Sequence, residues 1–191
     1  MPISLFTEEQ IYGEVRKAIA ETLRVPEASI QPDLSLIGDL GAESLDFIDI
    51  NYRLEQRFRL SMPRKYLVEH VEEFFGEGTA IDVEGRITET AVSIFKARLG
   101  PVGQKLKAGM AVEEIPILVT PRTLVEIVQE ILNSCPDTCA SCGAEEWKVA
   151  DGSVIACGGC GKAPAFAAGD DLITHWLAEF KAKGLQDGVR R

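Results

Sequence analysis

The sequence predicts a mainly α fold that also contains a small cysteine-rich hairpin. Apolar residues recur at helical spacing over residues 7–23, 44–58 and 120–133. Four of the five cysteines form two CxxC pairs late in the chain. Between these pairs, two β-prone runs flank Asp151-Gly152, a dipeptide typical of a tight hairpin turn.

The composition limits the classes of function. The chain has 191 residues, of which 46% are hydrophobic, so one or two domains can each bury a core. The net charge of −10 disfavours nucleic acid and anionic membranes, and favours partners with basic patches. No apolar run approaches the ~18 residues of a membrane span. The start, "MPISLFTEEQ", lacks the pattern of a signal peptide, so a cytoplasmic location is expected.

The first and third of these helices carry clear start signals. Thr7 and Gln10 fit a capping box. In "VTPRTLVEIVQEILN", Thr120 is the expected N-cap and Pro121 occupies the first helical position, where its missing N–H costs little.

The second helix is expected from Ser44 to Phe58. Ser44 follows a glycine-containing turn and is expected to be the N-cap. The expected buried stripe consists of Leu45, Ile48, Tyr52, Leu54 and Phe58.

The hydroxyl of Ser44 also suits a second use. Free N–H groups and the helix dipole favour a phosphate at a helix start. No GxSxG elbow surrounds this serine, and neither histidine lies in a recognisable motif. No catalytic residue is therefore expected.

The stretch "LIGDLGAESLDFIDINYRLEQRF" resembles the modification site of acyl carrier proteins. The residues in register are Asp39, Leu40, Gly41, Ala42, Ser44, Leu45, Asp46, Asp49, Leu54, Glu55 and Phe58. "ILVTPRTLVEIVQEIL" resembles the final helix of that family. The resemblance implies a four-helix bundle that is not an enzyme. It also implies that a phosphopantetheinyl transferase attaches 4′-phosphopantetheine to Ser44, whose arm then carries acyl groups as thioesters.

The resemblance also implies partners. Charge complementarity would guide docking to basic patches on an acyl-loading enzyme, a ketosynthase or an acyltransferase. The expected recognition residues are Asp39, Glu43, Leu45, Asp46, Asp49 and Glu55. The expected setting is a fatty-acid, polyketide or lipid pathway, with a monomeric carrier. Two alternatives stay open: a peptidyl or aminoacyl carrier, and an unmodified interaction scaffold.

The sequence departs from the family pattern in three ways. Glu43 replaces the usual Asp before the serine. Asn51 and Arg53 replace residues that are apolar or small in many members, which predicts a changed acyl pocket or partner choice. The third departure is an insertion at about residues 61–114, expected to add two helices. It either enlarges the acyl cavity, makes a partner surface, or decorates the bundle.

The cysteine pairs predict a metal site. Cys139, Cys142, Cys157 and Cys160 resemble the ligands of a zinc ribbon, and a glycine follows each pair. Four thiolates can close a tetrahedral site around one structural Zn²⁺. Iron, a redox-active CxxC or disulfides are the alternatives, and Cys135 is expected to be a free thiol.

The domain boundary is expected at residue 134. Residues 1–133 would form the carrier domain, and 134–191 the ribbon plus an amphipathic helix at 170–183. The ribbon lacks a basic face, which favours protein docking over nucleic-acid binding. The final helix is expected to pack on the ribbon, or else to present Trp176 and Phe180 to a partner.

Overall fold

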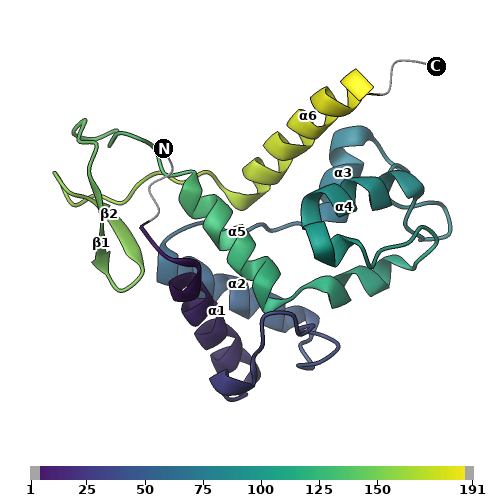
Figure 1. Ribbon diagram of the computed structural model, residues 1–191, viewed down its shortest axis with the longest axis horizontal. Coiled ribbons are helices and arrows are strands. Elements are labelled where there is room, and N and C mark those ends of the chain that lie inside the picture. Colours follow the sequence, from purple (N-terminus) through teal and green to yellow (C-terminus); the bar gives the residue numbers. More distant parts are fainter. Residues whose placement is uncertain (1–4, 188–191) are drawn as a thin grey trace. The chain divides into compact units, whose positions relative to one another are not determined.

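The structure is a computed structural model that describes residues 5–187 (Figure 1). It confirms a mainly α fold with one antiparallel two-stranded hairpin. In chain order the elements are α1 (Glu8–Leu23), η1 (Glu27–Ser29), α2 (Ser44–Phe58), α3 (Leu67–Phe75), α4 (Glu89–Gly103), η2 (Val112–Leu118), α5 (Pro121–Asn133), β1 (Trp147–Asp151), β2 (Val154–Cys157) and α6 (Gly169–Asp187).

The chain divides into two compact units. Unit 1 comprises Met1–Met62 and Val119–Ala168, and unit 2 comprises Pro63–Leu118 and Gly169–Arg191. The hairpin therefore lies in the same unit as α1, α2 and α5, whereas α6 lies with the insertion. These units do not follow the boundary expected at residue 134, and the division into a carrier domain at 1–133 and a second domain at 134–191 stays a prediction.

Helix α1 forms the centre of unit 1, because it packs against both α2 and α5. The expected capping box is confirmed: the Gln10 N–H donates to the Thr7 hydroxyl at 3.2 Å, and the Thr7 N–H donates to the Gln10 carboxamide oxygen at 2.8 Å. Thr120 caps α5, with Pro121 in its first turn, as predicted. The long connection before α2 is tied to the start of α5, since the Leu36 N–H donates to the Val119 carbonyl at 2.9 Å.

The bounds of α2 match the prediction, but its buried face does not. Leu45, Ile48 and Tyr52 are 76%, 62% and 57% exposed, so the predicted stripe is wrong for these three residues. The buried residues of α2 are Ile50, Leu54 and Phe58. The helix carries two apolar stripes, and only the one that faces α1 reaches the core.

Unit 2 has a hydrophobic core of its own. The insertion supplies buried side chains from α3 and α4, including Val71 and Phe95, and α6 adds Ile173 and Leu177. The two CxxC pairs and the hairpin between them are called the cysteine module below. Helix α6 packs against α3, so the expectation that it packs on this module was wrong. The reason is that its apolar face completes a core that the insertion leaves open.

Half-buried carboxylates hold the loops of unit 2. The Glu72 carboxylate accepts hydrogen bonds from the N–H groups of Gly78, Ala80 and Ile81. The Asp170 carboxylate, at the start of α6, accepts the Arg64 N–H at 3.1 Å and lies 2.9 Å from Nε2 of the buried His70. Helix α4 is interrupted at Gly100 by a positive φ of 52°. Across residues 5–187, no helix combines the length and apolarity needed to cross a membrane.

Candidate functional site

The turn before α2 is anchored on the core of unit 1. Ala42 is buried, and its N–H donates to the Leu36 carbonyl at 2.8 Å. Gly41 has a φ of +72°, which a side chain would strain. This anchored turn delivers the chain to the start of α2 in one fixed direction.

Ser44 lies one position further into the helix than predicted. The N-cap is Glu43, and Ser44 is the first helical residue, with an exposed side chain. The capping partner is Asp46, whose carboxylate accepts the Glu43 N–H at 2.8 Å. An acidic residue at the third helical position therefore caps the helix, and the prediction of Ser44 as N-cap was wrong. The serine hydroxyl lies at the positive end of the helix dipole, where a phosphate is favoured.

Most carboxylates expected to recognise partners also have partners within the chain. Besides the capping bond of Asp46, Asp39 accepts the Ser35 N–H at 2.8 Å, and Glu55 accepts the Met62 N–H at 2.9 Å. These bonds give each carboxylate a local structural role that the sequence analysis missed. For Asp46, the signal was its place three residues after Glu43, the spacing of a capping box.

Asp49 belongs to a network between α1 and α2. Its carboxylate accepts the Thr22 hydroxyl at 2.7 Å and the Arg53 Nε–H at 2.8 Å. The Arg53 hydrogen bond is the main cause that holds the pKa of Asp49 below its usual value. Arg53 also pairs with Glu21 at 2.7 Å, and Arg57 pairs with Glu21 at 2.8 Å. The unusual Arg53 therefore joins two helices.

An exposed apolar stripe starts beside Ser44. Leu45, Ile48 and Tyr52 follow one another along α2 at spacings of three and four residues, which places them along one side of the helix. Their exposure shows that unit 1 does not use them for its own core. Of the expected recognition set, only Leu45 belongs to this stripe.

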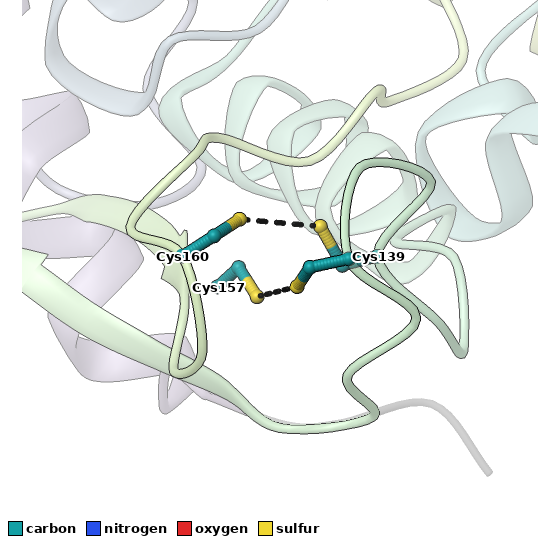
Figure 2. A group of neighbouring side chains, drawn as sticks. Cys139, Cys157 and Cys160 are labelled. Atoms are coloured by element: carbon teal, nitrogen blue, oxygen red, sulfur yellow. Dashed lines mark hydrogen bonds between the residues drawn. The ribbon is translucent and has the colours of Figure 1, made fainter.

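The four predicted cysteines converge in space. Their sulfur atoms all lie within 4.8 Å of one another. Sγ of Cys139 lies 3.7 Å from that of Cys160, and Sγ of Cys142 lies 3.6 Å from that of Cys157. Figure 2 shows the labelled side chains pointing toward a common centre. Four sulfurs at ~2.3 Å from one zinc ion in a tetrahedron would lie about 3.8 Å apart, so this donor set fits such an ion.

The two cysteine loops share one backbone geometry. Gly143 and Gly161 both have a φ of +74°, and their N–H groups donate to the carbonyls of Cys139 and Cys157 at 2.8 and 2.9 Å. The Ser141 N–H lowers the pKa of Cys139 to about 6, and the Cys160 N–H lowers the pKa of Cys157. These donors stabilise thiolates, the form in which cysteine binds metal.

The pKa of Cys142 moves in the other direction. The Ala144 N–H acts to lower it, but the neighbouring thiols of Cys157 and Cys160 outweigh that effect and raise it to about 12. A bound cation would remove this penalty, because four thiolates this close repel one another until a positive charge lies between them.

Comparisons with known proteins identify the family of the first part of the chain. Residues 13–76, a range that includes Ser44, match the family described as "Phosphopantetheine attachment site". The chain is 40% identical over 55 residues to an acyl carrier protein of Treponema pallidum (strain Nichols), covering 29% of this chain and 70% of that protein. It is 39% identical over 57 residues to one of Cyanidioschyzon merolae, covering 30% and 63%.

A third relative is the acyl carrier protein AcpXL of Rhizobium etli, 36% identical over 62 residues, with 32% of this chain and 67% of that protein covered. The chain belongs to the acyl carrier protein family, whose members are carriers and not enzymes. No solved structure matches. The family match ends at residue 76, so it does not extend to α4, the cysteine module or α6.

Proposed function

We propose that Ser44 is the residue that carries 4′-phosphopantetheine, and that the arm carries acyl groups as thioesters. The observation that supports this most is the exposed Ser44 at the first position of α2, within the family match. The anchored turn at Gly41 and Ala42 would let a transferase approach the hydroxyl without moving the bundle. The phosphate would then face the free N–H groups of the first helical turn.

The partners would be a phosphopantetheinyl transferase and the enzymes that load or accept the acyl group. We infer that they contact the stripe of Leu45, Ile48 and Tyr52, because these side chains are exposed and adjoin Ser44. Glu43 and the acidic residues around the stripe would steer basic surfaces toward it. Asp46 and Asp49 would contribute charge while keeping their hydrogen bonds within the chain.

The four cysteines would hold one structural zinc ion. The sulfur separations and the backbone donors support this, and four protein ligands leave no open position for a substrate. A fatty-acid, polyketide or lipid pathway in the cytoplasm fits a carrier whose thiols are kept reduced.

Intact-mass measurement tests the attachment site. The full chain is incubated with coenzyme A and a phosphopantetheinyl transferase, alongside the variants Ser44→Ala and Ser29→Ala. Ser29 is an exposed serine on η1 and serves as the matched control. Wild type and Ser29→Ala should each gain one phosphopantetheine, whereas Ser44→Ala should gain none. No gain in the wild type, or a gain that survives Ser44→Ala, would contradict the proposal.

A further inference from the structure

The cysteine module touches the end of α2 that lies farthest from Ser44. The Ser153 hydroxyl, in the turn between β1 and β2, donates to the Arg57 carbonyl at 2.7 Å. Arg57 lies in the last turn of α2, where carbonyl groups have no partner within the helix. The hairpin therefore satisfies one of these carbonyls.

The same module is fastened to the end of α5. The Ser134 hydroxyl donates to the Ile131 carbonyl at 2.6 Å and accepts the Ala167 N–H at 2.9 Å. Trp147, the first residue of β1, donates its indole N–H to the Pro136 carbonyl at 2.7 Å. The segments that enter and leave the module are thus both fixed close to the C-terminus of α5.

An apolar contact joins the hairpin to the core of unit 1. Ile155 on β2 is 2% exposed and lines a small cavity together with Phe6, Ile11 and Leu132. These partners come from the start of unit 1, from α1 and from α5. Ile155 therefore lies beside the start of α1 and the end of α5.

The hairpin that makes these contacts is too small to be stable alone. It has two strands, and isolated two-stranded hairpins are marginal in water. Cys157 is the last residue of β2 and pairs in register with Trp147. A metal ion bound by Cys157 would thus fix the strand that carries Ile155. The bound cysteine lies four residues after Ser153, so the ion would also hold the turn that contacts α2.

We propose that metal at the four cysteines clamps the C-terminal ends of α2 and α5, so that the order of the carrier helices depends on metal occupancy. The inference rests on the proposed metal site but not on the modification of Ser44. It gives the module a function: a metal-dependent brace for the helix that presents Ser44 and the apolar stripe.

Hydrogen exchange of the full chain tests the clamp, with zinc as the only added ligand. Peptides from the C-terminal half of α2 are compared in zinc-loaded and chelator-treated protein, for wild type, Ser153→Ala and Ser29→Ala. Ser29 is matched to Ser153, because its hydroxyl also donates to a carbonyl, that of Pro26, at 2.7 Å.

Chelation should speed exchange at the end of α2 in the wild type and in Ser29→Ala. Zinc-loaded Ser153→Ala should exchange there roughly three- to tenfold faster than zinc-loaded wild type, the range expected for the loss of one hydrogen bond. Its zinc content should stay at one per chain. Ile155→Ala, which removes the apolar contact, should give a second and independent loss of protection.

The contradicting results can be told apart. Faster exchange only within residues 139–162 on chelation would overturn the clamp while leaving the metal site intact. Substoichiometric zinc and iron in the untreated protein would overturn the metal site, and the clamp with it. Neither result would alter the mass gain at Ser44, so failure of the carrier proposal is read separately.

Discussion

Unit 1 exposes a serine and an apolar stripe that its core does not use, whereas the large apolar side chains of α6 pack within unit 2. In unit 1, Ser44 and the apolar stripe face solvent. In unit 2, Trp176 stacks on Phe180 at 5.3 Å between ring centroids, and Arg98 lies over the Trp176 ring. The proposed attachment site therefore lies in unit 1, and unit 2 is a helical unit with its own core.

The insertion forms part of a separate hydrophobic core. It is more than a loop on the bundle, because α3 and α4 share a core with α6 from the far end of the chain. A long insertion was predicted from sequence, but its union with α6 was not. Nothing local in "DDLITHWLAEFKAK" identifies which apolar surface will cover it.

The largest expected effect is in the core of unit 2. Leu177 is fully buried, so Leu177→Ala should destabilise unit 2 by about 2–5 kcal/mol. Urea unfolding measures the loss, and the half-buried Leu172→Ala on the same helix should cost less. The rate of Ser44 modification should remain that of wild type. A modification rate that falls with stability would show that the two units do not divide the work as proposed.

A second expected effect is a pH dependence of the stability of unit 2, which comes from Asp170. Partial burial acts to raise the pKa of Asp170, but the N–H groups of Arg64 and Lys65, together with His70, outweigh burial and lower it. A lowered folded-state pKa adds stability above the unfolded-state value of about 3.9 and loses it as the pH falls through the folded-state pKa.

Asp170→Asn should therefore destabilise the protein at neutral pH, and its difference from wild type should shrink in acid. Unfolding midpoints measured between neutral pH and pH 3 would show this. Asp171→Asn, at the exposed neighbouring position, should follow wild type throughout. A difference that does not change with pH would assign the effect of Asp170 to packing alone.

A smaller loss of stability is expected from variants of Asp46, which caps α2 and is also an expected recognition residue. Asp46→Ala removes the acceptor for the Glu43 N–H and should cost about 1 kcal/mol of stability. Asp46→Asn keeps an acceptor oxygen and should recover much of that loss in thermal unfolding. Equal loss in both variants would mean that the charge, and not the capping bond, stabilises α2.

The smallest change in stability is expected on the apolar stripe. Tyr52→Ser lies on an exposed surface and should shift stability by no more than about 0.5 kcal/mol. It should nevertheless slow acyl transfer to a partner enzyme, while the exposed Gln56→Ser, one turn further along α2, should not. Unchanged transfer by Tyr52→Ser would remove the stripe from the docking surface.

Local signals predicted much of unit 1. The capping residues Thr7 and Thr120, the bounds of α2 and the convergence of the cysteines all follow from short-range chemistry. The orientation of α2 did not follow, because two sets of apolar residues recur at helical spacings of three or four residues: Leu45, Ile48 and Tyr52, and Ile50, Leu54 and Phe58. The elements that pack against α2, chiefly α1, decide which stripe is buried, and their positions depend on tertiary structure.

The pairing of Arg53 and Arg57 with α1 was beyond sequence reasoning for the same reason. Their partner Glu21 lies 32 and 36 residues away along the chain. The contact of Ser153 with Arg57 spans 96 residues. Such contacts require the folded arrangement, although the residues that make them are ordinary in the sequence.

The most direct test of the central claim is a mass spectrum of the Ser44 peptide from protein isolated from its own cells with thioesters preserved. We predict that this peptide carries phosphopantetheine on Ser44, with an acyl group on the terminal thiol in part of the population. The acyl mass would also name the cargo. A Ser44 peptide that is entirely unmodified in cells with an active phosphopantetheinyl transferase would contradict the account.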